Sequence, residues 1–196
     1  VIVEYETSKR KAVTQDRKER NKRFNHRGSS ITKSLIKEFP DGAGDSLTIA
    51  HWWVGLSALP IEKSDMVAIG TVTNREAFLS EDETNVYTEY EVKIEKVFKD
   101  TTDSLKINDV VPLIRYGGSV RFKSSKIQKY KIGRHGILKK NHRYLMFLRK
   151  NNDVDLFILT GYELSDNKVI PIDGQDNKDP QSALPFDKYL NADVET

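Results

Sequence analysis

Alternation of apolar and polar residues is the clearest pattern in the middle of the chain. From Val86 to Ile94 every second residue suits a core, and the residues between them are mostly charged. This period of two predicts a strand with one buried face and one mostly wetted face. The period shifts at Val97 and Phe98, which indicates a bulge or a coiled stretch. We therefore expect residues 86–98 to form the long coiled strand of a sheet.

Shorter strands are expected on both sides of this segment. Stretches rich in β-branched and aromatic residues, separated by glycine, proline or polar turns, are typical of strands, and they occupy residues 47–54, 66–73, 110–115, 119–122, 143–149, 155–160 and 168–172. Gly70 and the Gly117-Gly118 pair stand where glycine permits a bend or a close backbone approach. Residues 144–148 are apolar throughout, which predicts cover on both faces of that strand.

The remaining segments suggest helices and an arm. Leu35, Ile36 and Phe39 share one helical face, and residues 184–190 suit a short closing helix. Residues 7–27 carry Lys and Arg on every side of any helix, so we expect an arm that is ordered only against a partner. The predicted fold is mainly β: a small Greek-key barrel (46–175) between an N-terminal arm with a short helix (1–45) and a tail (176–196).

Composition excludes several kinds of chemistry. The 196 residues are 37% hydrophobic and 31% charged, enough for one domain with a core but more polar than an average globular protein. Cysteine is absent, which excludes disulfides, thiolate metal sites and a cysteine nucleophile. The longest apolar run, residues 47–61, is interrupted by His51, Gly55 and Ser57, and no transmembrane segment is expected.

The charges are distributed unevenly along the chain. Between Val110 and Asn152 there is no acidic residue, whereas from Asp153 onward ten acidic residues stand against three lysines. We expect the basic stretch to face an anion, either an external partner or the protein's own acidic C-terminal part. The candidate binding residues in this stretch are Arg115, Arg121, Lys123, Lys126, Lys129, Tyr130 and Arg134.

Trp52 and Trp53 are further candidates for a binding surface. Neighbouring residues of a strand point to opposite faces, so both indoles cannot enter the same core. We expect one to pack on the barrel exterior and the other to meet a partner, because aromatic anchors dominate many protein contacts.

No motif indicates catalysis or a cofactor. The four histidines are far apart in the sequence. The two acidic loops, residues 81–83 and 173–179, offer oxygen ligands, but neither has the spacing of a calcium-binding loop. No nucleophilic serine motif is present, and the loop from Gly133 to Gly136 lacks the ending of a phosphate-binding loop. Cross-strand pairing with Arg115 or Arg121 accounts for Glu89, Glu91 and Glu95. We expect no enzyme activity, no cofactor and no metal.

The order of four segments resembles a known barrel: DMVAIGTV (65–72), VYTEYEVKIEKVFK (86–99), IRYGG (114–118) and NHRYLMFL (141–148). They are similar to netrin-like and tissue-inhibitor-of-metalloproteinase-like domains, which have an oligonucleotide/oligosaccharide-binding (OB) fold, and more closely to uncharacterised exported bacterial proteins. The resemblance covers roughly residues 65–173. It implies an OB-like barrel and an extracytoplasmic (periplasmic or extracellular) location, and a chain starting at Val1 fits removal of a signal peptide.

The resemblance does not carry the inhibitors' activity. Metalloproteinase inhibition depends on an N-terminal cysteine that chelates the zinc, and this chain begins Val1-Ile2-Val3 and has no cysteine. The leading hypothesis is a non-enzymatic, secreted binding or structural module, a subunit of a larger assembly, that uses its basic surface and arm. The alternative is binding of single-stranded nucleic acid or another polyanion, because Tyr116, Phe122 and Tyr130 are interleaved with the basic residues.

Overall fold

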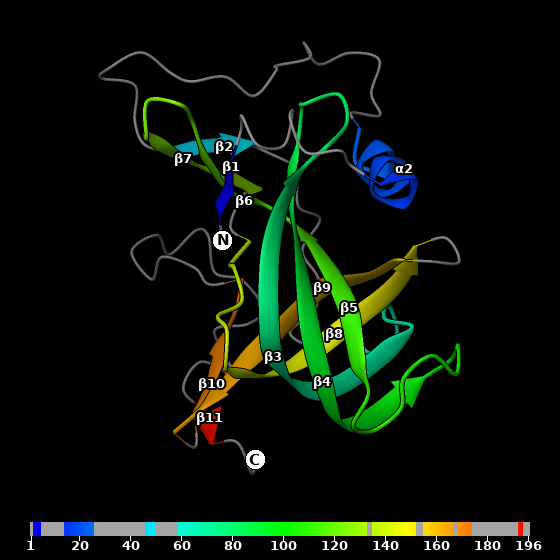
Figure 1. Cartoon of the computed structure of the whole chain (residues 1–196). Helices are drawn as coiled ribbons and strands as arrows, with labels where there is room; N and C mark the ends of the chain where they lie inside the picture. The colour runs from blue at the N-terminus through cyan, green and yellow to red at the C-terminus, as the bar shows by residue number, and fades with distance from the viewer. Residues whose placement is uncertain are drawn as a thin grey trace. The chain divides into compact units, whose positions relative to one another are not determined.

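The computed structural model describes residues 2–4, 14–25, 46–49, 59–132, 135–151, 155–166, 168–173 and 192–193. The fold of this part is mainly β, as predicted (Figure 1). Its elements are β1 (Ile2–Glu4), α2 (Gln15–Arg23), β2 (Ser46–Ile49), β3 (Met66–Leu79), β4 (Val86–Asp100), β5 (Val110–Tyr116), β6 (Gly118–Arg121), β7 (Ile127–Ile132), β8 (Arg143–Asn151), β9 (Asp155–Ser165), β10 (Lys168–Pro171) and β11 (Ala192–Asp193).

The chain divides into two compact units. Unit 1 comprises Val1–His51, Glu76–Glu89 and Tyr116–Gly133, and unit 2 comprises Trp52–Arg75, Tyr90–Arg115 and Arg134–Thr196. Residues 45, 175 and 176, at which we expected domain boundaries, lie outside the described residues. Those boundaries therefore stay predictions.

The larger sheet has the strand order β11-β10-β9-β5-β4-β3-β8. Strand β8 pairs with β9 as well as with β3, so β3, β4, β5, β9 and β8 have a ring-like arrangement. Most neighbours whose register is known are antiparallel, but β5 and β9 run parallel, with Leu113 opposite Leu156. Figure 1 shows β3, β4 and β5 side by side, with β8 and β9 crossing behind them.

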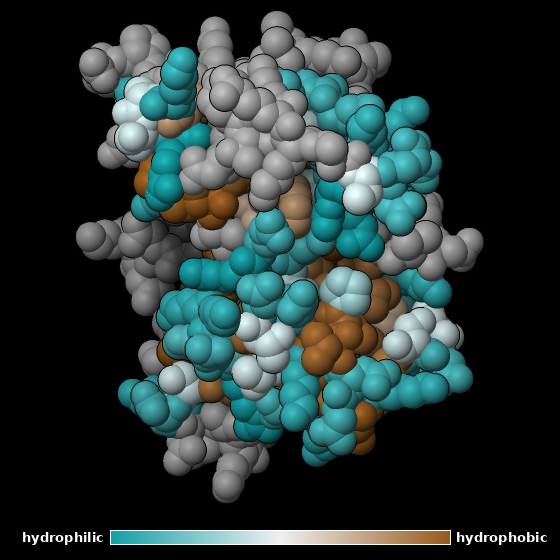
Figure 2. Space-filling model, viewed as in Figure 1, coloured by the Kyte–Doolittle hydropathy of each residue, from teal (hydrophilic) through white to brown (hydrophobic). Residues whose placement is uncertain are grey.

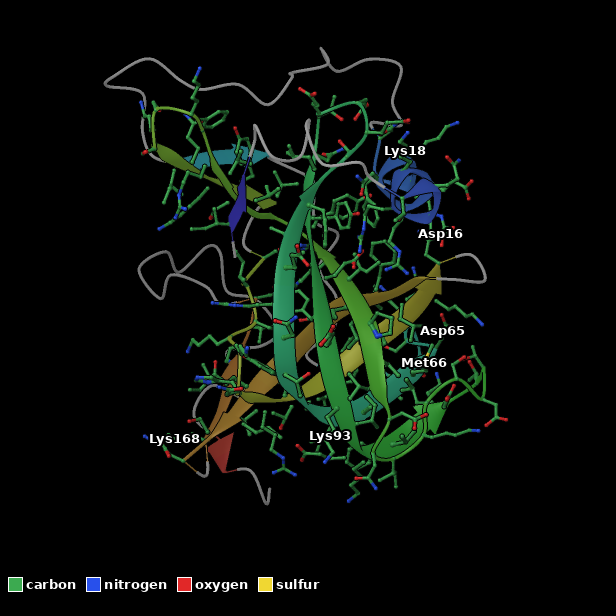
Figure 3. All side chains as sticks on the ribbon, viewed as in Figure 1. Asp16, Lys18, Asp65, Met66, Lys93 and Lys168 are labelled. Carbon is green, nitrogen blue, oxygen red and sulfur yellow. The ribbon has the colours of Figure 1, made fainter. Side chains whose placement is uncertain are left out.

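The core of unit 2 confirms the predicted alternation in β4. Tyr90, Val92 and Ile94 are buried in this core, whereas Glu91 and Lys93 between them are exposed, as Figure 3 shows for Lys93. At the predicted shift, Val97 packs against the core and Phe98 is 54% exposed. From Tyr90 onward the hydrophobic pattern of this strand therefore agrees with its burial, whereas Tyr87, on the face predicted to be wetted, is buried.

Strand β8 is covered on both faces at its centre, as expected. Tyr144, Met146 and Leu148 enter the core of unit 2, and Phe147, on the opposite face, is only 1% exposed. The register of β8 against β9 shifts between Phe147 and Leu148. The predicted helix with Leu35, Ile36 and Phe39 and the predicted closing helix over residues 184–190, either of which could cover this strand, lie outside the described residues.

Unit 1 contains a four-stranded sheet with the order β1-β6-β7-β2. Strands β6 and β7 form an antiparallel hairpin, and the short strands β1 and β2 add to it in parallel. Its inner side contributes Val3, Val120, Phe122 and Tyr130 to a second core. Strand β7 was not predicted. Gln128 stands at an inward-facing position of this strand, where a hydrophobic residue would have completed the alternating pattern.

Part of the N-terminal arm packs on unit 1, and this corrects the expectation that the arm is ordered only against a partner. Helix α2 begins after Thr14, whose hydroxyl accepts a hydrogen bond from the Arg17 amide. No residue of the helix itself is buried, but Phe24, directly after it, is 1% exposed. The contact between this segment and the rest of unit 1 is made by polar side chains and the ring of Phe24. For this reason the absence of an apolar helix face in the sequence did not predict it.

Candidate functional site

Five of the predicted binding residues lie on the β6–β7 hairpin of unit 1, namely four basic residues and Tyr130. Arg121 ends β6, Lys129 lies within β7, and Lys123 and Lys126 belong to the turn between the strands. Trp52, Trp53 and Arg134 lie outside the described residues, so their roles stay predictions.

Strand alternation separates the two faces of this hairpin. Val120, Gln128 and Tyr130 point inward and are at most 2% exposed. Arg121 lies opposite Ile127, and Lys129 lies opposite Ser119, so both basic residues belong to the outer face. No carboxylate occurs between residues 116 and 132. The outer face is therefore built to present positive charge.

Two isoleucines add apolar area to this outer face. Ile2 of β1 lies opposite Ser119 and is 40% exposed, and Ile127 of β7 is 36% exposed. Figure 2 shows apolar side chains among hydrophilic ones over β1, β6 and β7. We name as the basic hairpin face the set Ile2, Arg121, Lys123, Lys126, Ile127 and Lys129.

The aromatic residues interleaved with the basic ones turn inward. Phe122 is 6% exposed and Tyr130 is 2% exposed, and both belong to the core of unit 1. The ring of Tyr116 lies against Phe24, with the ring centroids 5.4 Å apart. Tyr130 was expected on the binding surface, and its burial corrects that expectation, because its position in β7 has the inward parity.

Arg115 also differs from the expectation, because it lies inside unit 2. It follows the core residue Leu113 by two positions and so shares its face. Its Nη2 lies 2.6 Å from Oδ2 of Asp173, and its Nη1 donates to the carbonyl oxygen of Gly136 at 3.1 Å. For this residue, the anion is the acidic C-terminal part of the chain itself.

Two of the three carboxylates of β4, those of Glu89 and Glu95, find partners other than those expected. Glu89 pairs with Arg17 and Arg20 of α2. Glu95 accepts hydrogen bonds from Thr71 Oγ1 and from Arg143 Nε, at 2.5 and 2.6 Å. Burial by itself raises the pKa of Glu95, but these two hydrogen bonds and the charge of Arg143 outweigh it and hold the pKa below its usual value.

Sequence reasoning missed a charged cluster around Glu163 in unit 2. His142 Nδ1 lies 2.7 Å from Glu163 Oε1, Lys139 Nζ lies 3.2 Å from Oε2, and Tyr144 donates to Oε2 at 3.4 Å. Burial raises the pKa of Glu163, but the hydrogen bonds from His142 and Lys139 lower it more, so it lies below its usual value. The register that places Tyr144 opposite Glu163 brings these distant residues together.

Within the part of the chain that the structure describes, no three His, Cys, Asp or Glu side chains are grouped so that they could hold a metal ion. In the same part, no helix is long and apolar enough to cross a bilayer. No protein-family model matches this chain, and no curated protein matches it either.

Proposed function

We propose that this protein is a non-enzymatic, exported binding module whose basic hairpin face engages an acidic partner protein within a larger assembly. The observation that carries this proposal is the separation of the two faces of β6–β7, with rings inside and cations outside. The rings of Phe122 and Tyr130 are buried in the core, whereas Lys123 and Lys129 are exposed, so their positive charges are accessible to a partner.

The mixed character of the outer face favours a protein partner over a nucleic acid. Single-stranded nucleic acids are bound by cations together with exposed aromatic rings on which bases stack. Phe122 and Tyr130 are buried here, and the exposed apolar groups are Ile2 and Ile127. Aliphatic groups between cations suit an acidic protein surface that also offers apolar contact.

The ring-like sheet supports the further proposal of an OB-like Greek-key barrel. Strand β9 lies between β5 and β8 in space, although β8 precedes it in the chain, and a Greek-key barrel needs such a crossover. In this proposal the barrel is the scaffold, and the basic hairpin face is an addition to it. The extracytoplasmic location follows from the resemblance and is tested by fractionating cells of the native source.

The test compares two triple variants of the full chain. Lys123→Gln/Lys126→Gln/Lys129→Gln neutralises the basic hairpin face, and the control Lys93→Gln/Lys106→Gln/Lys168→Gln removes the same charge from exposed positions in unit 2. The wild-type complex is isolated from the native source, its acidic partner is purified, and the affinities of the variants for that partner are measured by calorimetry.

We expect the hairpin variant to bind the purified partner at least tenfold more weakly, since three charge pairs of about 0.5–1 kcal/mol each are lost. The control is expected to bind like the wild type. Equal affinity of both variants would overturn the assignment of the face. Recovery of the protein with nucleic acid alone, released by salt, would favour the alternative of polyanion binding.

A further inference from the structure

A second surface of unit 1 combines aromatic rings with a carboxylate and is already occupied by the arm. We name this surface the aromatic–carboxylate site. It consists of Phe78 on β3, Tyr87 and Glu89 on β4, and Tyr116 at the end of β5. Phe24 stacks on Tyr87 with ring centroids 3.8 Å apart and planes 10° apart. The guanidinium of Arg17 lies 3.9 Å from the ring centroid of Phe78.

The polar half of the site holds two arginines and an amide. Arg17 binds Glu89 with both terminal nitrogens, at 2.6 and 3.2 Å, and Arg20 Nη1 lies 3.1 Å from the same carboxylate. Tyr87 donates its hydroxyl proton to Asn21 Oδ1 at 2.6 Å. Burial and the nearby charge of Glu89 raise the pKa of Tyr87, so the hydroxyl stays protonated as a donor.

The four contacting residues follow the spacing of one helix face. They stand at positions i, i+3, i+4 and i+7: Arg17, Arg20, Asn21 and Phe24. Residues with this spacing on one face of an amphipathic helix are the ones that bind in a groove of a partner protein. The remainder of the helix contributes little, since no residue of α2 is buried and Asp16 and Lys18 lie on its exposed surface (Figure 3). These four side chains make the contacts with the aromatic–carboxylate site, and Asn25 and the carbonyl oxygens of Asn21 and Phe24 add hydrogen bonds to residues 81–85 beside it.

A contact of this kind is exchangeable. An isolated helix of nine residues is marginal in water, so α2 gains its order from the site. Arg17 and Arg20 keep 30% and 23% of their side-chain surface exposed, which limits the strength of their pairing with Glu89. A covalently attached segment still competes at an effective concentration on the order of millimolar.

We propose that the aromatic–carboxylate site is a recognition site for a helical segment of a partner protein with Arg at i and i+3, a side-chain acceptor at i+4 and an aromatic residue at i+7, and that α2 occupies it in cis. A partner with this spacing binds by displacing α2. This partner is basic, so it differs from the acidic partner of the basic hairpin face.

The test offers the arm's own segment in trans. The probe is a fluorescein-labelled synthetic peptide of residues 14–25, and a control peptide carries Gln at the positions of Arg17 and Arg20. Two full-length variants loosen the cis arm independently: Phe24→Ala, and Arg17→Gln/Arg20→Gln. Far-UV circular dichroism establishes that each variant keeps the β structure, and two different loosening changes protect the test against a folding defect in one of them.

We expect the probe to bind both loosened variants at least tenfold more tightly than the wild type, because the cis competitor is weakened. The control peptide should bind at least tenfold more weakly than the probe, and Glu89→Gln in the Phe24→Ala chain should abolish this preference. Equal binding of the two peptides, or no effect of Glu89→Gln, would overturn the proposal. The variant Lys123→Gln/Lys126→Gln/Lys129→Gln should bind the peptide with the same affinity as the wild type. This outcome makes a failure of the present proposal distinguishable from a failure of the proposed function.

Discussion

Arg115 and Asp173 form an ion pair inside unit 2, and each side chain is only 2% exposed. Thr160 donates its hydroxyl to Oδ2 of the same carboxylate at 2.7 Å, and the amide of Gly136 donates to Oδ1 at 3.2 Å. The pair thus joins β5, β9 and two segments outside the strands through one buried charge cluster. A buried pair of this kind contributes little net energy while intact, but it is costly to break.

Replacing one member of this pair is expected to destabilise the protein strongly. Asp173→Asn keeps the shape but leaves the Arg115 charge uncompensated in the interior, at a cost of about 3–5 kcal/mol. Urea unfolding measures the loss. The control Arg143→Gln breaks the pair with Glu95, whose side chains are 48% and 32% exposed, and is expected to cost about 1 kcal/mol or less. Similar losses in the two variants would contradict the buried position of Asp173.

The cluster around Glu163 predicts a pH dependence of stability. The pKa of Glu163 in the folded state lies below its usual value of about 4.3, so the folded state favours the ionised form. Its stabilising contribution is complete above the usual pKa and is lost as the pH falls through the lowered one. The stability gap between the wild type and Glu163→Gln should therefore narrow as the pH falls below about 4.3.

Chemical denaturation between pH 3 and pH 8 checks this expectation. Glu62→Gln is the control, because Glu62 is exposed. It should leave the pH profile of the wild type unchanged. A gap that widens as the pH falls from about 4 to 3 would show that Glu163 contributes through its protonated form, contrary to the contacts with His142 and Lys139.

Gly70 predicts a steric limit in β3. A Cβ atom at this position would lie 2.6 Å from Val92 Cγ1 and 2.7 Å from the carbonyl oxygen of Lys93. Because one of these neighbours is backbone, Gly70→Ala should force the strands apart and cost roughly 1–3 kcal/mol, measured by the midpoint of urea unfolding. Thr73→Ala, which removes one exposed hydrogen bond to Glu91, is expected to cost less. An unchanged midpoint for Gly70→Ala would refute the close approach.

Tyr87→Phe separates the polar and apolar parts of the α2 contact. The variant keeps the ring that stacks on Phe24 but loses the hydrogen bond to Asn21, with an expected cost of about 0.5–1.5 kcal/mol. Amide hydrogen exchange should become faster in α2 and remain unchanged in β8 and β9 of unit 2. Unchanged protection of α2 would show that the ring contact alone holds the helix.

Local patterns in the sequence predict much of the sheet correctly. The period of two in β4 predicts which residues enter the core, because a strand presents alternate residues to opposite faces wherever it lies. The predicted bend between β5 and β6 is confirmed by Gly117, whose φ is +107°, a conformation that favours glycine. The continuous apolar run of β8 predicts its cover on both faces in the same way.

The alternation of apolar and polar residues does not predict burial where a side chain is covered by a segment distant in the sequence. Tyr87 has the parity of the wet face of β4, yet it is fully buried, because Phe24 of the arm stacks on it. Arg115 has the composition of a surface residue, yet Asp173 neutralises it inside unit 2. In both cases the environment of the side chain is created by a segment more than fifty residues away in the chain.

The sequence by itself determined most strands of the larger sheet, the core-facing residues of β4, the bend at Gly117 and the basic stretch, because these follow from periodicity, backbone conformation and composition. The tertiary structure alone decided which basic residues lie on the surface, what covers the outer face of Tyr87, and which carboxylate each arginine meets. Those outcomes depend on strand register and chain topology, which bring distant charges and rings within contact distance, and no local pattern encodes that proximity.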